Sequence, residues 1–329
     1  MSDHDVVRHS YSPSFAGITQ AQRKLSQIGI VTPILPVRHH DATLLAKAEC
    51  CQRTGSFKLR GAWHRLTALA DSERARGVVA FSSGNHAQGI ALAARTLGMR
   101  ATIVMPADAP AAKRDATAAL GATIVPYDRA TESREAIAAA LAAEQGATLV
   151  PSFDDPWIIE GQGTLGLEAV GQLAAMGLAA PRRIVIPCGG GGLSAGTALA
   201  VPDAEIIVAE PEGWGDMGAS LARGAIVPVG PNPPPTACDA LQTLRVAERT
   251  FAILHARGAR GVTVREAEVD AAMRFAFRHL KLVVEPGGAV ALAAVLAGRV
   301  PAGEGTLVVL SGGNVDPAAY AARLTGPCN

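Results

Sequence analysis

The sequence predicts an α/β protein of two lobes, each built on an open, mostly parallel sheet flanked by helices. Three observations support this fold class. The chain has 329 residues, enough for two domains of ordinary size. Short runs rich in Val and Ile alternate with Ala-rich helical stretches along most of the chain. The short runs are apolar on both faces, which is typical of strands in a parallel sheet covered by helices on both sides.

Two series of elements can be followed along the chain. Between residues 77 and 153, expected strands and helices alternate in the order VVAFS, HAQGIALAARTLG, ATIVM, AAKRDATAALG, ATIVPY, ESREAIAAALAAEQG and ATLVPS. The second series contains GTLGLEAVGQLAAM, RRIVIP, AEIIVAEPE, EVDAAMRFAFRHL, GGAVALAAVLAG and TLVVLSGGN. The segment 225–235 is rich in proline, which joins neither a ladder nor a helix, so we expect a surface loop there.

The composition excludes several classes of function. The 30 Lys and Arg residues against 29 Asp and Glu leave a net charge of +1, so nothing favours nucleic acid or an anionic membrane as a partner. No apolar run reaches the roughly 18 residues of a spanning helix. The first ten residues lack the apolar centre of a signal peptide, so we expect a cytoplasmic protein. The five cysteines include no C-x-x-C pair and indicate reduced thiols.

Four segments carry residues suited to chemistry, and the first is TGSFKLRGA. Lys58 lies there between Phe57 and Leu59. A lysine among apolar groups loses hydration, which lowers its pKa and leaves a free amine for imine chemistry. Taken alone, the segment is equally typical of a surface lysine on an amphipathic helix that also carries Arg60.

The second segment, FSSGNHAQG, follows an expected strand and opens a helix, where free N–H groups favour anions. Gly84 allows a backbone conformation closed to other residues. The turn also supplies four polar side chains, those of Ser82, Ser83, Asn85 and His86. Such a turn can bind a carboxylate and present a hydroxyl for proton transfer, although an ordinary capping loop remains an alternative.

The third segment, PCGGGGLSAG, contains four consecutive glycines between a strand and a helix. Each costs about 0.5–1 kcal/mol relative to alanine in regular structure, so four in a row indicate a phosphate site more than a simple turn. The segment also contains G-x-G-x-x-A, and Glu210 closes the next strand, so a dinucleotide-dependent oxidoreductase is an alternative. In the fourth segment, VLSGGNVD, Ser311 follows a buried strand, where open α/β sheets bind ligands.

Together these segments resemble the fold-type II pyridoxal-phosphate enzymes, in the branch of serine/threonine dehydratases and serine racemase that includes threo-3-hydroxyaspartate dehydratases. SFKLRGA resembles the cofactor-lysine motif, SSGNHAQG the substrate-carboxylate loop, GGGGLSAG the phosphate loop and SGGN the contact to the pyridine nitrogen. FDDPWIIEGQGT matches a further family stretch. The resemblance covers nearly the whole chain. It implies a tryptophan synthase β-like fold, with residues 77–153 as a small mobile domain and residues 1–76 and 154–329 as a large cofactor-binding domain.

The resemblance also implies how pyridoxal 5'-phosphate is bound. Lys58 would form the Schiff base and move protons on one face of the cofactor, and Phe57 would pack near the ring. Asn85 would hydrogen-bond the 3-hydroxyl, and Ser311 would meet the ring nitrogen. The phosphate would be held by Gly189, Gly190, Gly191, Gly192 and the amide of Leu193. Because a serine does not keep the ring nitrogen protonated, the cofactor is a weaker electron sink, which favours prompt loss of a β-leaving group.

The implied reaction is β-elimination from serine, threonine or 3-hydroxyaspartate, which gives a keto or imino acid and ammonia. Ser82, Ser83, Asn85 and His86 would bind the substrate. Ser83 matches the acid/base of serine racemase on the opposite face, so a racemase with side lyase activity is an alternative. Arg134 matches a substrate-pocket arginine that can accept a second carboxylate, which makes 3-hydroxyaspartate a serious candidate. A helix-surface arginine is an equal alternative.

By the same resemblance, Glu210 and Asp216 match a divalent-cation site, with the carbonyl of Trp214 as a third ligand. Hard oxygen ligands suit Mg²⁺ or Ca²⁺, although solvated carboxylates are the simpler interpretation of two acids six residues apart. Phe153 stands where animal serine racemases have asparagine, which favours a dehydratase. The segment 237–240, Ala-Cys-Asp-Ala, replaces the Ala-Asp-Gly of familiar members and leaves the choice of substrate open. We expect a homodimer, as is usual in the family.

Overall fold

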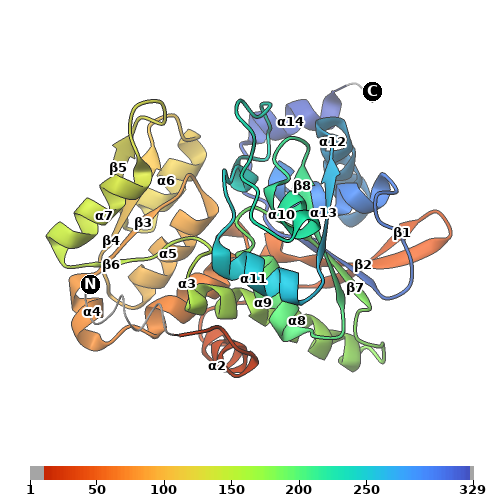
Figure 1. Ribbon diagram of the computed structural model, residues 1–329, viewed down its shortest axis with the longest axis horizontal. Helices are drawn as coiled ribbons and strands as arrows, with labels where there is room; N and C mark the ends of the chain where they lie inside the picture. Colours follow the sequence, from red (N-terminus) through yellow and green to blue (C-terminus); the bar gives the residue numbers. More distant parts are fainter. Residues whose placement is uncertain (1–10, 327–329) are drawn as a thin grey trace.

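The computed structural model describes residues 11–326 and contains two separate sheets (Figure 1). The larger has six strands in the order β1-β2-β10-β7-β8-β9, and the smaller has four in the order β5-β4-β3-β6. Neighbouring strands are parallel throughout, except for the antiparallel pair β1 and β2. The prediction of two mostly parallel sheets flanked by helices is confirmed.

The larger sheet carries most of the apolar core. Its strands are β1 (Ile34–His39), β2 (Ala42–Ala48), β7 (Arg183–Pro187), β8 (Glu205–Pro211), β9 (Arg260–Val264) and β10 (Thr306–Leu310). Alternate residues of β7, β8 and β10 point to opposite faces, as the strand period requires. One set packs against α12 (Glu266–Phe275) and α13 (Pro286–Leu296). The other set packs against α8 (Pro156–Ala175), α9 (Gly192–Ala200) and α11 (Glu248–Ala256).

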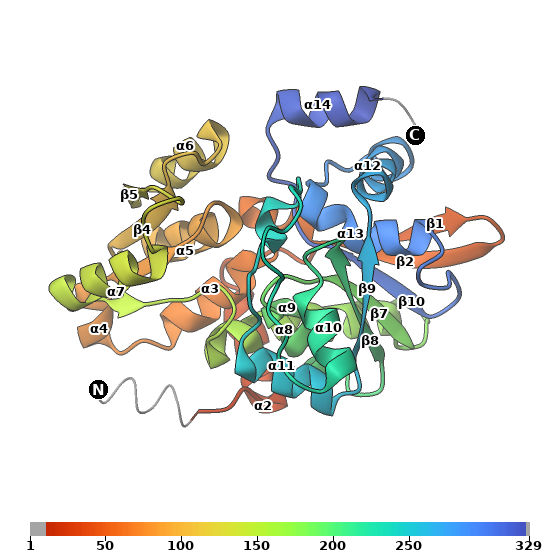
Figure 2. The same ribbon diagram turned by 45° about the horizontal axis from the view of Figure 1, so that its top comes forward.

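The smaller sheet consists of β3 (Val78–Phe81), β4 (Ala101–Pro106), β5 (Thr123–Tyr127) and β6 (Thr148–Leu149). Helix α7 (Arg134–Gln145) packs on one face through Ala138 and Ala142. Helices α5 (Asn85–Thr96), α2 (Phe15–Leu25) and α3 (Lys58–Thr67) pack on the other face. Figure 2 shows α5, α7 and α6 (Ala111–Ala119) grouped around this sheet, apart from α8 to α11. The domain boundaries at residues 77 and 153 stay a prediction.

Several elements were not predicted from the sequence. These are β1, β2, β9, α2, α3, α4 (Asp71–Arg76), α10 (Asp216–Arg223), α11, α14 (Pro317–Thr325) and the short helices η1 (Glu49–Cys51), η2 (Arg53–Gly55) and η3 (Asp239–Leu241). The helix expected up to residue 280 ends as α12 at Phe275, and a π-helical turn, η4 (Ala276–Leu280), follows it. The proline-rich segment 225–235 holds no helix or strand and is largely exposed, as expected.

A buried ion-pair network joins the start of α3 to α8. Arg60 Nε lies 2.7 Å from Glu49 Oε2, and its Nη2 lies 2.9 Å from Glu168 Oε1. Lys47 Nζ lies 2.6 Å from the same Glu168 oxygen. Burial alone would raise the pKa of Glu168, but the two cations lower it. Because Arg60 is buried in this network, α3 is not a surface helix, and Lys58 starts from a fixed backbone.

No helix within residues 11–326 is both long and apolar enough to cross a membrane. The first ten residues, which carry the cytoplasmic expectation, lie outside the described part of the chain, as does Cys328. The other four cysteines, Cys50, Cys51, Cys188 and Cys238, form no disulfide.

Candidate active site

One pocket collects the residues that the sequence singled out for cofactor and substrate. It is lined by the segments that follow β3, β7 and β10 and by the starts of α3, α5 and α9. Ligands of open α/β sheets bind at this end of the strands. The predicted residues that line it are Phe57, Lys58, Ser82, Ser83, Asn85, His86, Arg134, Gly189, Gly190, Gly191, Gly192, Leu193 and Ser311. Their individual roles stay predictions.

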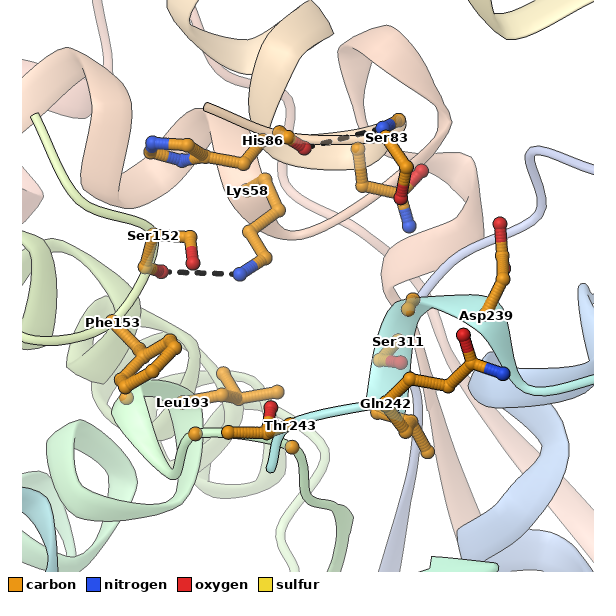
Figure 3. A pocket seen from close by; sticks show the side chains of 18 of the residues that line it. Lys58, Ser83, His86, Ser152, Phe153, Leu193, Asp239, Gln242, Thr243 and Ser311 are labelled. Carbon is orange, nitrogen blue, oxygen red and sulfur yellow. Dashed lines mark hydrogen bonds between the residues drawn. The ribbon is translucent and has the colours of Figure 1, made fainter. Parts of the chain in front are cut away.

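Lys58 points its amine into the pocket, between the Ser83 loop and the side that carries Leu193 and Thr243 (Figure 3). Its Nζ donates to the carbonyl of Ser152 at 3.1 Å. Burial lowers the pKa of Lys58 to about 8, with Glu285 opposing the shift. A large share of this amine is therefore neutral near pH 8, the form that attacks a carbonyl and accepts a proton.

The glycine run is shaped for close approach of a ligand to the backbone. Gly191 has a φ of +85°, and a Cβ there would lie 2.6 Å from the Met217 side chain. A Cβ on Gly190 would lie 2.3 Å from the ring of Phe153. The run ends at the start of α9, whose first N–H groups have no partner within the helix. The hydroxyl of Thr250 donates to the Gly190 carbonyl at 2.8 Å and holds the run in place. This cradle fits a phosphate group.

The turn from Ser82 to His86 differs from expectation in one respect. Gly84 has an extended φ of −175°, so a left-handed backbone is not the reason for a glycine here. The reason is packing, because a Cβ at Gly84 would lie 2.8 Å from Cδ of Lys113. The Ser82 hydroxyl accepts from the Gly84 N–H at 3.1 Å and closes the turn. Helix α5 begins at Asn85, so its first N–H groups lie at the pocket.

His86 is held in the neutral form. Burial lowers its pKa to about 3, and the nearby charge of Lys58 adds to the shift. Its Nε2 lies 3.0 Å from the carbonyl of Val150, and because a carbonyl only accepts, Nε2 carries the proton. Nδ1 is then an acceptor, buried and without a partner among residues 11–326. His86 therefore offers the pocket a neutral acceptor and no positive charge.

Arg134 is the first residue of α7 and borders the pocket beside Phe81, with its guanidinium carbon 5.4 Å from the centre of that ring. Its Nε lies 2.8 Å from Glu135 Oε1, and both side chains are partly exposed. Exposed ion pairs of this kind contribute little to stability. The guanidinium therefore remains free to exchange Glu135 for an anionic ligand.

Three charged residues of the pocket, Lys113, Asp239 and Glu285, were missed by the sequence analysis. Lys113 Nζ donates to Asp239 Oδ2 at 2.5 Å and lies 3.8 Å from Glu285 Oε2. The Asn85 amide donates to Glu285 Oε1. The only local signal was the sequence Glu-Pro-Gly-Gly at the start of α13, where a residue preceding a first-turn proline marks a helix start. Gln242 and Thr243 also line the pocket and carried no local signal.

The three predicted cation ligands lie outside this pocket, between the end of β8 and the start of α10. Glu210 is buried and accepts from the N–H groups of Met217 and Gly218 at 3.0 and 2.8 Å. Neither carboxylate oxygen of Asp216 has a hydrogen-bond partner in the described chain. The side chain of Trp214, beside them, is also buried and donates to the Pro234 carbonyl.

Burial raises the pKa of both Glu210 and Asp216, because no ion pair within residues 11–326 compensates them. Uncompensated buried carboxylates fit a divalent cation, which takes oxygen ligands. No group of three or more His, Cys, Asp or Glu side chains with metal-binding geometry occurs in the described residues. Because the Glu210 carboxylate faces the backbone of α10 and not the pocket, nothing places it on a nucleotide ribose.

Comparison with known proteins gives matches over most of the chain. A family described as "Pyridoxal-phosphate dependent enzyme" matches residues 25–312. L-threo-3-hydroxyaspartate ammonia-lyase of a Pseudomonas species is 43% identical over 325 residues, which cover 95% of this chain and 99% of the relative. The Saccharomyces cerevisiae protein of the same name is 42% identical over 326 residues, 95% and 97% of the two chains. Serine racemase of Schizosaccharomyces pombe is 35% identical over 333 residues, 98% of each.

Solved structures give the same assignment. Maize serine racemase superimposes with a TM-score of 0.87 at 33% identity and covers 94% of this chain and 96% of its own. A bacterial-type threonine deaminase, from the organism abbreviated T.th., superimposes with a TM-score of 0.85 at 43% identity, with coverage of 92% and 99%. With its family match, its full-length relatives and a lysine amine beside a glycine cradle, this chain belongs to the pyridoxal-phosphate-dependent enzymes.

Proposed function

We propose that this enzyme is an ammonia-lyase for L-threo-3-hydroxyaspartate. The observation that carries the proposal is the guanidinium of Arg134 in the same pocket as the amine of Lys58, because this substrate has a second carboxylate for a second cation to bind. Two relatives named for this activity, at 43% and 42% identity over 95% of the chain, support it. Threonine ammonia-lyases, such as that of Thermotoga maritima at 39% identity, support the broader β-elimination class.

The residues of the pocket fit pyridoxal 5'-phosphate. Lys58 supplies the amine to which it attaches, Gly189–Gly192 and the start of α9 accept the phosphate, and Ser311 offers a hydroxyl to the ring nitrogen. When bound, the cofactor supplies an electron sink that stabilises negative charge at the α-carbon of an amino acid.

The protein itself supplies binding groups and a base. Ser82, Ser83 and the N–H groups at the start of α5 bind the α-carboxylate, and Arg134 binds the carboxylate on the β-carbon. Lys58 accepts the α-proton, which its lowered pKa allows at neutral to basic pH. The 3-hydroxyl leaves with a proton as water. The resulting imino acid then takes up one water molecule and yields a keto acid and ammonia.

The test is an assay of keto-acid release with L-threo-3-hydroxyaspartate, its stereoisomers, L-serine and L-threonine. We expect the highest kcat/KM with L-threo-3-hydroxyaspartate, and no turnover in Lys58→Ala, whereas Lys24→Ala on α2 retains it. Arg134→Gln should raise KM for hydroxyaspartate by about tenfold or more and leave KM for serine unchanged, because only one substrate has the second carboxylate. Equal losses for both substrates would remove Arg134 from the proposal.

Serine racemase activity is the second candidate. It is favoured by the position of Ser83 in the pocket and by relatives named serine racemase at 35% identity. If Ser83 transfers a proton on the face opposite Lys58, Ser83→Ala reduces racemisation of L-serine more than its elimination. Equal reduction of both rates would reject this role.

We further propose a divalent cation, Mg²⁺ or Ca²⁺, at Glu210, the carbonyl of Trp214 and Asp216. The two buried carboxylates without a cationic partner in the described chain support it. We also propose a cytoplasmic homodimer. Free cysteines support a reducing compartment, to be checked by cell fractionation. Exposed apolar side chains, among them Phe15, Ile30 and Val31, support self-association, to be checked by sedimentation.

Residues 77–153 are proposed as the small mobile domain and residues 1–76 and 154–329 as the large one. In support, all four strands of the smaller sheet fall within 77–153. Closure over the substrate would exclude water from the site. Crystals with and without a bound substrate analogue should differ by a rotation of this domain, and superimposable halves would contradict the division.

A further inference from the structure

The charged cluster of Lys113, Asp239 and Glu285 lies beside Asn85, where the elements of the two sheets meet. Lys113 comes from α6, in the unit of the smaller sheet, and its side chain is largely buried. Asp239 and Glu285 come from η3 and from the residue before α13, in the unit of the larger sheet. Lys113 donates to Asp239 at 2.5 Å and lies 3.8 Å from Glu285 Oε2. Figure 3 shows Asp239 at the edge of the pocket that holds Lys58.

Glu285 is only 1% exposed, and its charge at that depth depends on its neighbours. Burial raises its pKa to about 7, Lys113 and the Asn85 amide oppose the shift, and Asp239 adds to it. Its Oε2 has no hydrogen-bond partner in the part of the chain that the structure describes. The other cation in electrostatic reach is Lys58, which is the group that takes the cofactor. Lys113 is therefore the cation that remains to keep Glu285 ionised.

The orientation of the Asn85 amide follows from two hydrogen bonds. Its Oδ1 accepts from Asn314 Nδ2 at 2.8 Å, and its Nδ2 donates to Glu285 Oε1. Asn314 Nδ2 also donates to the carbonyl of Thr54 at 2.7 Å, and because a carbonyl only accepts, the amide of Asn314 cannot be reversed. One N–H of Asn85 then remains for a ligand. A protonated Glu285 has its own O–H to donate, and its hold on the Asn85 N–H weakens.

We propose that Lys113 is a positioning residue: its ammonium keeps Glu285 ionised, and the Glu285 carboxylate fixes the Asn85 amide so that one N–H serves the 3-oxygen of the cofactor. Asp239 acts in the opposite sense, because its negative charge favours protonation of Glu285 and competes for Lys113. The inference rests on the proposed site only through the assignment of Asn85 to the cofactor. It does not depend on which amino acid is the substrate.

The test is the dissociation constant of pyridoxal phosphate from the apoenzyme between pH 6 and pH 9, without substrate, followed by tryptophan fluorescence. The wild type should bind more weakly as pH falls through about 7, where Glu285 takes up a proton. Lys113→Met should move the midpoint upward by about one pH unit or more and weaken binding about tenfold at pH 7. Asp239→Asn should move the midpoint downward.

Two variants serve as matched controls. Lys113→Arg keeps the positive charge and should keep the midpoint near that of the wild type. Glu285→Gln has no carboxyl group to titrate, so the transition should vanish. If Lys113→Met does not fold, the downward shift in Asp239→Asn and the flat profile of Glu285→Gln decide the question. A merely structural role would lower the melting temperature of these variants without moving their midpoints in opposite directions.

Midpoints of Lys113→Met and Asp239→Asn that coincide or shift in the same direction overturn the inference, and so does a wild-type transition in Glu285→Gln. These results leave the proposed function intact if wild-type apoenzyme still takes up the cofactor. A wild type that binds no pyridoxal phosphate refutes the proposed function itself, so the two failures are distinguishable.

Discussion

Two buried groups of charged side chains in this enzyme are built in opposite ways. Around Arg60, two cations face two carboxylates, and every one of the four has an ion-pair partner within 3 Å. Around Glu210 and Asp216, two carboxylates lie together, and the described chain brings no lysine or arginine to them. Both groups are buried equally deeply, so burial alone does not explain the difference.

The difference teaches which buried charges belong to the fold and which await a ligand. Desolvating a charge costs several kcal/mol unless a partner compensates it, and the fold supplies that partner around Arg60. Where the fold supplies none, a bound ion or molecule has to. The pocket shows the same pattern, with a lysine, a neutral histidine and a buried glutamate that the protein only partly compensates.

The largest effect should come from breaking the compensated group. Arg60→Met keeps much of the side-chain volume but leaves Glu49 and Glu168 facing each other without the guanidinium. We expect a loss of about 3–5 kcal/mol in the free energy of unfolding, measured by urea denaturation. The matched control is Arg260→Met, which removes an exposed pair with Glu205 and should cost about 1 kcal/mol or less. Similar losses for both variants would contradict the comparison.

The next effect should come from completing the uncompensated group. Mg²⁺ or Ca²⁺ at 100 times its dissociation constant should raise the free energy of unfolding by about 2.7 kcal/mol, seen as a higher melting temperature. A variant with both Glu210→Gln and Asp216→Asn should not respond to the cation. Glu212→Gln changes an exposed acid nearby and should respond like the wild type. A wild type indifferent to both cations and to chelators would reject the site.

A smaller effect concerns acid stability. Because the pKa of His86 is about 3 in the folded enzyme and near 6.5 in an unfolded chain, the unfolded state binds the extra proton between these values. Stability from this group is therefore present above pH 6.5 and lost as pH falls, by up to about 1.4 kcal/mol per pH unit.

Urea denaturation of wild type and His86→Gln at pH 6.5, 5.5 and 4.5 measures this loss, and the variant should lose less. Glutamine keeps a donor for the Val150 carbonyl, so packing is largely preserved. The exposed His255→Gln variant is the control and should follow the wild type. Parallel curves for wild type and His86→Gln would show that His86 is not held neutral.

The smallest effect on stability should come from the exposed pair at the pocket mouth. Glu135→Gln should change the free energy of unfolding by about 0.5 kcal/mol or less, because both side chains are partly exposed. It removes the carboxylate that competes for Arg134, so KM for hydroxyaspartate should fall while KM for serine stays constant. An unchanged KM for hydroxyaspartate would mean that Glu135 does not compete with the substrate.

Much of this fold could be predicted because its central strands carry an unambiguous pattern. Strands β7, β8 and β10 are buried on both faces and read as unbroken apolar runs. The hairpin of β1 and β2 escaped prediction, since β1 contains Pro36, Arg38 and His39 and lies at the sheet edge, where proline and charge are tolerated.

The site could be predicted only as far as it is local in sequence. The lysine, serine and glycine segments each follow a strand or open a helix, so the topology brings them to one pocket. Lys113 and Glu285 lie more than 170 residues apart, and nothing near either in sequence distinguishes it from a solvated surface charge. Their burial and pairing arise only when α6 meets the start of α13.

The pocket also divides its labour between the two sheets. The amine, the phosphate cradle and Ser311 come from segments outside 77–153, whereas Ser82 to His86, Lys113 and Arg134 lie within it. Chemistry and selectivity can therefore evolve separately. A chimera that receives this one contiguous insert from a relative with another diet would keep its catalytic engine and change what it consumes.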